Sequence, residues 1–322
     1  MSTTRCGASR KEIFHPEAPE GRTDFFLKPG IDVSSFRNGS ATAPAAEKIQ
    51  EDVELRSKSI ISECSVPPGR LPEGVARSHP KLLRGKTLDP VSIGSYPIHV
   101  YRLGLRHVAA ARNRFWCVLS SVEKARAMGF RLIAGRDAFI STRAHLRILL
   151  GIHLDRNPAE LAISVSESGK PFLADHVGLE THFNVSHSGD VGLIAITNSG
   201  PIGIDVERID AGHDLHGVAE FSFTRAERLR FEAMSPVGRP REFFSIWTGK
   251  EAVVKAWGDG MRFPLNRLEI PFRSASPACG WPIPTGSSGR PPLYLKDLPA
   301  IPGYAAALAV TSPFAPIQWR EI

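Results

Sequence analysis

Two acidic residues in the middle of the chain carry side chains that could bind a metal ion. In the stretch G-I-D-V-E, residues 203–207, the two-residue period of a β-strand places Asp205 and Glu207 on the same side. Two carboxylates this close repel each other unless a cation lies between them or one of them takes up a proton. Oxygen ligands of this kind suit Mg²⁺, which takes one or two carboxylates together with substrate phosphates. The alternative is a solvent-facing strand edge with two acids that have no chemical role.

A predicted helix further along the chain carries an acid and a cation in helical register. The stretch W-T-G-K-E-A-V-V-K places Trp247, Glu251 and Lys255 on one helix face, at positions i, i+4 and i+8. By itself, this spacing is explained by a surface ion pair, because Glu followed four residues later by Lys stabilises a helix by about 0.2–0.5 kcal/mol.

A third stretch, F-N-V-S-H-S-G at residues 183–189, ends a predicted strand in small hydrogen-bonding side chains. Adjacent strand residues point to opposite faces, so Ser186 is badly placed to use His187 as the base of a hydrolase triad. The chain also has no G-x-S-x-G nucleophile elbow. Hydroxyls, an imidazole and backbone N–H groups could instead surround an anion such as a phosphate. Taken alone, the run favours a plain turn.

A fourth stretch, G-K-P-F at residues 169–172, is a turn that carries the ammonium group of Lys170. Lysine before proline is common at protein surfaces, where it has no role beyond the turn itself. The turn by itself therefore favours a structural interpretation.

The composition excludes several classes of protein. The chain has 322 residues, a formal net charge of +7 and 42% hydrophobic residues, which fits neither a membrane protein nor a wholly disordered one. Its longest apolar runs fall far short of the ~20 residues of a membrane-spanning helix. The N-terminus lacks the apolar segment of a secretory signal, so we expect a cytoplasmic protein. The cysteines form no C-x-x-C pair, which argues against a disulfide framework or a thiolate zinc site: Cys6, Cys64, Cys117 and Cys279.

The positive charge is concentrated in one segment. Residues 102–147 contain ten Lys and Arg but only two acidic residues, Glu123 and Asp137. A solvated basic face is the usual meaning of such a run. Nucleic-acid binding is a second interpretation, although no base-stacking aromatics or DNA-reading motif accompany the basic residues. A small polyphosphate ligand would fit equally well.

The hydrophobic patterns predict where ordered structure begins. Residues 1–92 sustain no apolar periodicity and are rich in Pro, Ser and Ala, so we expect a mostly disordered extension, or else a wrongly assigned start of translation. Beyond them, helices and strands alternate with short loops, which indicates the α+β class. Strands are predicted at 98–103, 162–165, 183–185, 191–197, 202–206 and 304–310, and helices from about 122, at 136–150, at 224–234 and at 241–257.

Taken in order, the four stretches are far more specific than any one of them. The chain resembles the Sfp type (surfactin-synthetase-activating type) of 4′-phosphopantetheinyl transferase, in which G-K-P, F-N-x-S-H-S, G-I-D-V-E and W-x-x-K-E-A-x-x-K follow one another. The resemblance covers residues 98–311 and leaves out 1–92. The chain departs from the family pattern at Gly135, where Asp is frequent, and at Gly249, an unusual choice inside a helix.

The resemblance implies a fold and an activity. The family fold is a monomer of two similar α/β halves related by a pseudo-twofold, which here would be residues 93–204 and 205–322. Enzymes of this type transfer the 4′-phosphopantetheine arm of coenzyme A to a serine of an acyl-carrier or peptidyl-carrier protein and release 3′,5′-ADP. The carriers serve siderophore, polyketide, nonribosomal peptide or fatty-acid synthesis, and neither nucleic acid nor membrane is an expected partner.

The resemblance also implies roles for particular residues. Asp205, Glu207 and Glu251 match ligands of Mg²⁺, with Mn²⁺ as an alternative, and Glu251 matches the base that accepts the serine proton. Lys255 matches a cation that assists the leaving group. The matches to the coenzyme A site are Ser186 and His187 at the nucleotide phosphates, Lys170 and Pro171 beside the adenine, and Arg136 in a helix that borders the same pocket.

The alternative is a non-catalytic coenzyme A-binding or nucleic-acid-binding protein that keeps the same fold. Loss of a metal-binding carboxylate or of Lys255 would favour it, and all of these residues are present.

Overall fold

A computed structural model describes residues 96–106, 111–175, 180–212, 214–271, 280–284, 289–313 and 315–322. The predicted disordered extension, residues 1–92, lies outside the described residues. All described residues belong to one compact unit of the chain.

The first sheet has four strands in the order β10-β1-β5-β4. Strand β1 (Ile98–Gly104) lies between β5 (Val191–Thr197), to which it is antiparallel, and β10 (Ile317–Glu321), to which it is parallel. Strand β4 (His182–Ser188) pairs with β5 and forms the edge of the sheet. A separate short hairpin joins β2 (Ile163–Val165) to β3 (Pro171–Leu173).

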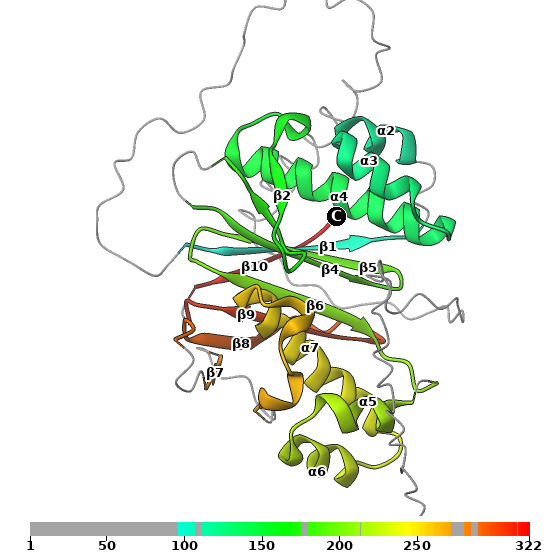
Figure 1. Ribbon diagram of the computed structural model, residues 1–322, viewed down its shortest axis with the longest axis vertical. Helices are drawn as coiled ribbons and strands as arrows, with labels where there is room; N and C mark the ends of the chain where they lie inside the picture. The colour runs from blue at the N-terminus through cyan, green and yellow to red at the C-terminus, as the bar shows by residue number, and fades with distance from the viewer. Residues whose placement is uncertain are drawn as a thin grey trace, which may run out of the picture. The chain divides into compact units, whose positions relative to one another are not determined.

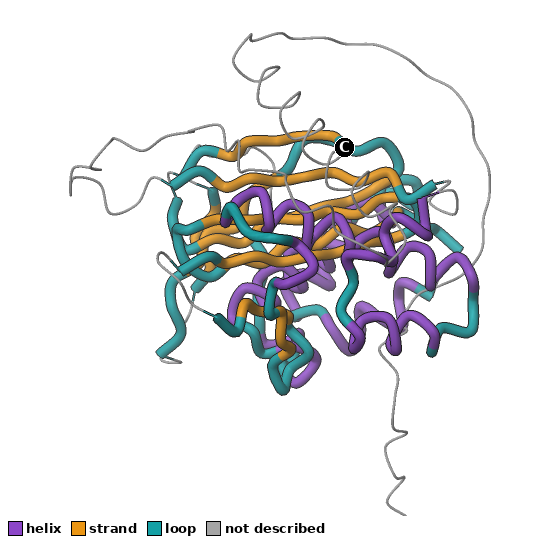
Figure 2. The backbone as a smooth tube through the Cα atoms, turned by 90° about the horizontal axis from the view of Figure 1, so that it is seen from above, coloured by secondary structure: helices purple, strands orange, loops and turns teal. Residues whose placement is uncertain are grey.

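The second sheet also has four strands, in the order β6-β9-β8-β7, and every neighbouring pair is antiparallel. Strand β6 (Ile202–Arg208) forms one edge and pairs with β9 (Tyr304–Val310). Strands β8 (Leu293–Asp297) and β7 (Trp281–Ile283) complete it. Figure 2 shows that the strands of both sheets lie along nearly the same axis.

Two long helices each cover one sheet, while shorter helices pack at their ends (Figure 1). The long helices are α4 (Ile133–Leu154) and α7 (Arg239–Trp257). The shorter ones are α2 (Arg112–Val118), α3 (Ser121–Met128), α5 (Leu215–Ser222) and α6 (Arg225–Ala233), with 3₁₀ turns η2 (Pro158–Glu160), η3 (Gly260–Arg262) and η4 (Leu265–Arg267). Helices α3 and α6 begin in capping boxes, in which Ser120 pairs with Glu123 and Thr224 with Glu227.

Three of the apolar clusters hold the two sheets and the two long helices together. In the first, Leu146, Leu149 and Leu150 of α4 pack against the first sheet. In the second, Ala252, Val253 and Ala256 of α7 pack against β8 and β9. The third joins the two sheets, with Val100 and Leu193 of the first sheet beside Ile204 and Leu308 of the second. Among the described residues, no helix combines the length and the apolar content that a membrane crossing needs.

The α+β class and the main predicted elements are confirmed, while several short elements were not predicted. Strands 191–197 and 304–310 match β5 and β9, and the helices predicted at 136–150 and 241–257 are the longer α4 and α7. The unpredicted helices and strands are α2, α5, β3, β7, β8 and β10. The predicted division between residues 204 and 205 falls inside β6, and β10 pairs with β1, so the two sheets do not coincide with residues 93–204 and 205–322.

Helix α7 approaches β6 most closely at Gly203. A Cβ atom at this position would lie 2.0 Å from the carbonyl oxygen of Ala252 and 2.5 Å from the backbone nitrogen of Ala256. Only a residue without a side chain allows this contact between the backbones of a strand and a helix. The close approach places Asp205, two residues further along β6, beside the last two turns of α7.

We therefore predict that Gly203→Ala destabilises the protein strongly. Overpacking a core costs about 1–3 kcal/mol, and rigid backbone atoms on the helix place this variant at or above the upper end of that range. Gly104→Ala is the matched control, because a Cβ there meets nothing within 4 Å. Chemical denaturation of both variants checks the prediction, and an equal small effect of the two would contradict the close contact of α7 with β6.

Candidate active site

Strands β4 and β6 lie side by side where the two sheets meet, and side chains join them instead of a backbone ladder. Every second residue of β4 in this region carries a small oxygen-bearing side chain, and every second backbone N–H of β6 donates to one. We call this arrangement the side-chain ladder. Its hydrogen bonds run from Ile204 N to Asn184 Oδ1 (2.9 Å), from Val206 N to Ser186 Oγ (3.4 Å) and from Arg208 N to Ser188 Oγ (3.1 Å).

The serines of the side-chain ladder also orient the two acids of β6. Ser186 Oγ donates to Asp205 Oδ1 at 2.7 Å, and Ser188 Oγ donates to Glu207 Oε2 at 2.8 Å. Strand β4 continues through Ser188, beyond the end that was predicted at residue 185. The predicted alternation of β6 holds as well, since Ile204 and Val206 are fully buried in the cluster between the sheets.

Lys255 joins this cluster from α7. Its Nζ lies 2.6 Å from Asp205 Oδ1 and 3.2 Å from Ser186 Oγ. The interpretation of Glu251 and Lys255 as a surface ion pair is therefore wrong. The Lys255 ammonium group pairs instead with Asp205, across the interface between α7 and β6. An ammonium group has three N–H donors. Two face these acceptors, which leaves one for a ligand.

The carboxylates are set in surroundings that penalise their negative charge. Burial, the charge of Asp205 and the charge of Glu251 raise the pKa of Glu207 to about 8, although the hydrogen bond from Ser188 and the charge of Lys255 oppose the rise. Burial and then the Asp205 charge also raise the pKa of Glu251. For Lys255, burial lowers the pKa, but the surrounding carboxylates, Asp205 first, outweigh it and raise the pKa. The site therefore sets three carboxyl groups beside the single ammonium group of Lys255, and ionisation of Glu207 and Glu251 is disfavoured there.

One carboxylate oxygen in this group lacks a partner. Asp205 is 1% exposed, and its Oδ2 accepts no hydrogen bond from any described residue. A buried, unpaired carboxylate oxygen requires an explanation, and a cation is one that fits the oxygen ligands present. No three His, Cys, Asp or Glu side chains of the described residues form a complete metal-binding cluster. The arrangement thus fits an ion such as Mg²⁺, which uses one or two carboxylates and completes its shell with substrate phosphates and water.

His187 lies on the side of β4 opposite to Ser186. Its side chain is exposed, whereas Ser186 is buried, as the strand period requires. The Ser186 hydroxyl gives its single proton to Asp205, so no Ser–His pair of the hydrolase kind exists here. Although His187 reaches solvent, the protein around its ring displaces enough water to lower its pKa, and the nearby positive charge of Lys255 lowers it further.

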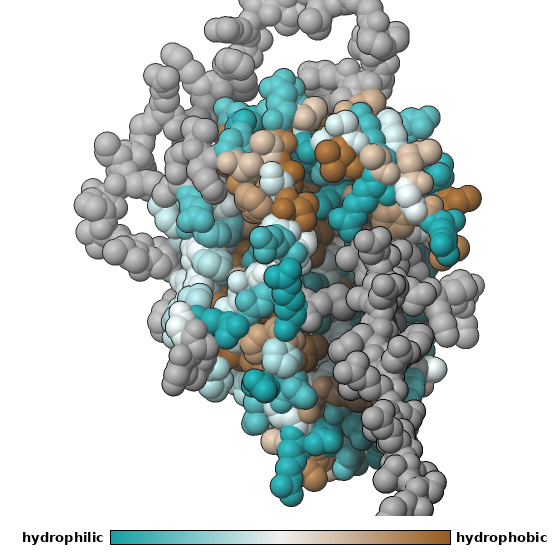
Figure 3. Space-filling view, in the orientation of Figure 1, coloured by the Kyte–Doolittle hydropathy of each residue, from teal (hydrophilic) through white to brown (hydrophobic). Residues whose placement is uncertain are grey.

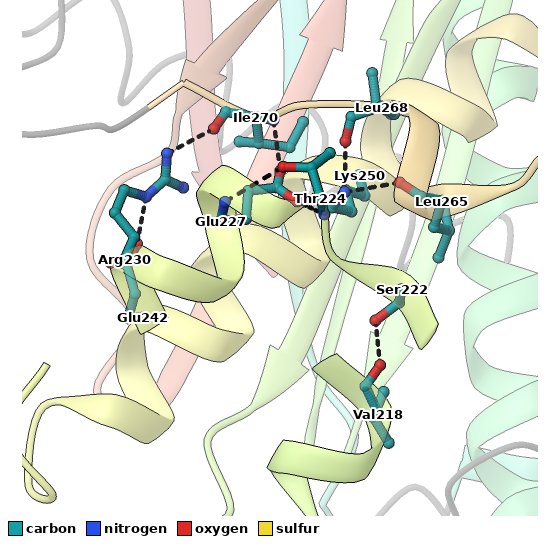
Figure 4. Close-up of polar contacts among 10 residues, drawn as sticks. All are labelled: Val218, Ser222, Thr224, Glu227, Arg230, Glu242, Lys250, Leu265, Leu268 and Ile270. Atoms are coloured by element: carbon teal, nitrogen blue, oxygen red, sulfur yellow. Dashed lines mark hydrogen bonds and ion pairs between the residues drawn. The ribbon is translucent and has the colours of Figure 1, made fainter. Parts of the chain in front are cut away.

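A second buried lysine, which the sequence did not single out, fixes α7 on its far side (Figure 4). Lys250 and Glu227 of α6 form a fully buried ion pair at 2.6 Å. Lys250 Nζ also donates to the carbonyl oxygens of Leu265, at 2.7 Å, and of Leu268. Glu227 in turn accepts from Ile270 N at 2.6 Å. Since Glu251 follows Lys250 directly, this network fixes the rotation of α7 that turns Glu251 toward β6.

The remaining predicted residues lie in two other places. Lys170 and Pro171 belong to the β2–β3 hairpin, where Pro171 begins β3 and the Lys170 ammonium reaches the C-terminal end of α7. Arg136 lies in the first turn of α4 and lines a cavity of about 220 Å³ with residues of α2, among them Arg112 and Trp116. The structure thus brings together Ser186, Asp205, Glu207, Glu251 and Lys255, and it sets Arg136 apart from them.

A large cavity lies beyond the end of α7 and not at the carboxylates. It has a volume of about 900 Å³ and is lined by the hairpin residues 166–168 and by residues 257–259, among others. Its charged groups are largely paired, since Arg290 contacts Asp259 at 2.9 Å and stacks over the rings of Trp257 and Phe263. The cavity therefore borders the candidate site without containing its acids.

Asn184, Ser188, Glu227 and Lys250 are the positioning residues that sequence reasoning missed. A signal for the first two was present, because small polar residues at every second position of a strand can serve a neighbouring strand edge. A signal for Lys250 was its place inside W-x-x-K-E-A-x-x-K. Its partner Glu227 is 23 residues away, and nothing local in the sequence indicates that pairing.

Comparison with known proteins supplies the family. The model of the 4′-phosphopantetheinyl transferase superfamily matches residues 201–289. HetI, a 4′-phosphopantetheinyl transferase of Nostoc sp., is 32% identical over 182 residues, which are 56% of this chain and 76% of HetI. Sfp of Bacillus subtilis strain 168 is 28% identical over 171 residues, 53% of this chain and 72% of Sfp. The chain spans less than two thirds of a Synechocystis relative, slr0495, which is 34% identical over 154 residues, 48% of this chain and 63% of that protein. From these matches, the chain belongs to the 4′-phosphopantetheinyl transferase superfamily.

Proposed function

We propose that this protein is a 4′-phosphopantetheinyl transferase of the Sfp type, which moves the phosphopantetheine arm of coenzyme A to a serine of an acyl-carrier or peptidyl-carrier protein. One observation carries the proposal. Lys255, Asp205 and Ser186 form a hydrogen-bonded cluster, the charge of Asp205 raises the pKa of both Glu207 and Glu251, and one oxygen of Asp205 is unpaired among the described residues. Acids with raised pKa beside a cation suit the transfer of a proton and of a charged phosphoryl group.

In the proposed reaction, the carrier serine oxygen bonds to the phosphorus that bears the pantetheine arm, and the bond from that phosphorus to 3′,5′-ADP breaks. Glu251 accepts the serine proton, and its raised pKa makes it a stronger base than an exposed glutamate. Lys255 directs its remaining N–H toward the oxygen of the departing 3′,5′-ADP, where negative charge develops. Asp205 holds Lys255 in that position through the 2.6 Å contact.

We propose Asp205, Glu207 and Glu251 as the residues that would hold Mg²⁺, or Mn²⁺ as an alternative, although the three side chains do not form a complete metal-binding cluster in the described structure. The ion, when bound, neutralises charge on the pyrophosphate oxygens. The residues of the chain prepare this role, because the serines of the side-chain ladder orient Asp205 and Glu207 and the folded protein buries Asp205.

The contacts with coenzyme A remain predictions. Ser186 and His187 are proposed at the nucleotide phosphates, and Pro171 and Arg136 at the nucleotide end. The contact predicted for Lys170 would require a free donor on its ammonium group, which already donates to three backbone carbonyl oxygens. Ser186 would have to turn its hydroxyl from Asp205 to donate to a phosphate, because a hydroxyl has only one proton.

We propose that the partner is a carrier protein, and the carrier proteins that such transferases modify are acidic. Apolar and hydrophilic side chains mix over helices α2–α4 on the face seen in Figure 3. Val122 and Met128 of α3 are 75% and 67% exposed, and Ile133 of α4 is 65% exposed. With the basic residues of the segment 102–147, such a surface suits an acidic partner with apolar side chains. We further propose a cytoplasmic monomer whose two halves are related by a pseudo-twofold, each half with a four-stranded sheet and one long helix.

The activity is tested by mass spectrometry of candidate apo-carriers. We expect that a carrier incubated with the protein, coenzyme A and Mg²⁺ gains the mass of one phosphopantetheine on its serine, and that 3′,5′-ADP is released in equal amount. Siderophore, polyketide, peptide and fatty-acid carriers are compared in parallel. Binding of coenzyme A without modification of any carrier would instead support the non-catalytic alternative.

Substitutions at Glu251, Lys255 and Asp205 test the assigned roles. We predict that Glu251→Gln folds normally and loses on the order of 10²-fold or more in turnover, because positioned general-base catalysis is worth about 10²–10⁴-fold. Lys255→Ala should also lose turnover, since the leaving oxygen lacks its cation. Asp205→Ala should act chiefly as a metal defect with a higher Mg²⁺ requirement. Turnover measured against Mg²⁺ concentration separates the three, and near-normal turnover of Glu251→Gln would remove the proposed base.

The raised pKa of Glu207 predicts how stability depends on pH. The folded protein keeps this proton up to about pH 8, whereas an unfolded glutamate loses it near its ordinary pKa of 4.5, so unfolding releases a proton in this window. In the presence of a chelator, we expect stability to fall as pH rises from 4.5 to 8, and Glu207→Gln to reduce that fall. Mg²⁺ should then raise the melting temperature of the unmodified protein at high pH more than that of the variant.

Glu220→Gln, on the exposed face of α5, is the control for this experiment and should leave the dependence unchanged. Melting temperatures at several pH values, with chelator and with Mg²⁺, provide the measurement. The same pH dependence in all three proteins would show that Glu207 is not the titrating group.

A further inference from the structure

The ammonium group of Lys170 is fully occupied by the backbone at the end of α7. Its Nζ donates to the carbonyl oxygens of Lys255 at 2.5 Å, of Ala256 at 3.2 Å and of Ile202, the first residue of β6, at 3.2 Å. An ammonium group has three N–H donors, and all three have acceptors here. The side chain is therefore fully engaged within the protein and has no donor left for a nucleotide.

The carbonyl groups that Lys170 binds are those a helix leaves without partners. The last carbonyls of a helix have no intrahelical donor, and they also carry the negative end of the helix dipole. In α7, the backbone N–H groups of Gly258 and Asp259 both donate to Val254, which leaves the next two carbonyls for another donor. A lysine near a helix C-terminus can supply that donor and a favourable charge, and here the lysine comes from a hairpin far away in sequence.

The hairpin that carries Lys170 is itself well fixed. Ser166 N donates to Lys170 O at 2.9 Å, and Lys170 N donates to Ser166 Oγ at 3.1 Å, which closes the turn on both sides. The hairpin also contacts the loop after α7, because a Cβ at Gly260 would lie 2.7 Å from the carbonyl oxygen of Ser168. Two separate contacts thus join the G-K-P turn to the end of α7.

This contact acts directly on Lys255. The carbonyl that Lys170 binds at 2.5 Å belongs to the same residue whose ammonium group lies 2.6 Å from Asp205. The backbone of Lys255 is held on one side by Lys170, and its side chain is held on the other by Asp205. Lys170 also binds Ile202, three residues before Asp205, so one ammonium group fixes the distance between β6 and the end of α7.

We propose that Lys170 is a positioning residue that holds Lys255 and Asp205 in register by binding the backbone of α7 and β6, and that its ammonium group does not bind coenzyme A. The proposal deepens the proposed function and rests on it for its kinetic test. It replaces the contact with the adenine that the family resemblance implies for this side chain.

The test is Lys170→Met in the full chain, which keeps the length and the apolar stem of the side chain but removes the donors. We expect turnover to fall about tenfold or more, because small displacements of catalytic groups have large effects on rate. The KM for coenzyme A should stay within about twofold, as for a side chain that does not touch this substrate. In a Lys255→Ala background, Lys170→Met should change turnover by less than about twofold, because Lys170 acts through Lys255.

Lys296→Met is the matched control. Lys296 is buried and, like Lys170, donates to a backbone carbonyl, that of Ala315 at 3.4 Å, but it lies in β8 and not at the end of α7. A general loss of stability would appear in both variants, whereas the loss of turnover should appear only in Lys170→Met. If Lys170→Met does not fold, Lys170→Arg serves in its place, and a retained KM for coenzyme A with reduced turnover again supports the proposal.

Hydrogen exchange gives a second measurement that needs no transferase activity. The amides of Gly258 and Asp259 should exchange faster in Lys170→Met than in the unmodified protein, while Lys296→Met should leave them unchanged. Unchanged exchange of these amides in Lys170→Met, or a raised KM for coenzyme A at normal turnover, would overturn the proposal. An unmodified protein that modifies no carrier would instead refute the proposed function, and the exchange result would still decide the role of Lys170.

Discussion

The side-chain ladder between β4 and β6 is the interaction on which the rest of the site depends. Two sheets meet there at their edge strands, and the N–H groups of Ile204, Val206 and Arg208 have no backbone partner on β4. A buried donor left unpaired costs about 1–3 kcal/mol. Asn184, Ser186 and Ser188 prevent that cost, and so the junction of the sheets requires small polar side chains whatever the chemistry nearby. The candidate site makes use of groups that the fold already needs.

The same constraint explains why the charged residues lie so close together. The hydroxyls that accept from β6 have one proton each to give, and they direct it to Asp205 and Glu207. Gly203 then lets α7 approach β6 until Lys255 reaches Asp205 at 2.6 Å. Burial raises the pKa of Glu207 and Glu251, and one lysine does not compensate all of the charge. A divalent cation bound between these carboxyl groups would favour their ionised forms, because an opposite charge nearby lowers the pKa of an acid.

The sequence predicts those features that depend on neighbours along the chain. Local periodicity predicts strands β5 and β9 and helix α7. It also predicts that Asp205 and Glu207 lie on the same side of β6. Strand β10 does not, because its only reason to form is the distant β1. The partner of Lys255 was missed for the same reason. A Glu four residues away is the favoured local partner, yet tertiary packing brings Asp205 closer, and its contact with the lysine is shielded from water.

Three lysines meet around α7, and their hydrogen bonds separate structural from chemical roles better than their positions in motifs do. Lys250 is fully buried and has three acceptors, Glu227 and the carbonyls of Leu265 and Leu268. Lys170 also has three, all of them carbonyl oxygens. Lys255 has two, and its side chain is 28% exposed. Only a lysine with a donor to spare and access to solvent can meet a charge that develops during a reaction. By this criterion, the two saturated lysines hold α7 from opposite sides, and Lys255 is the one that α7 presents to a substrate.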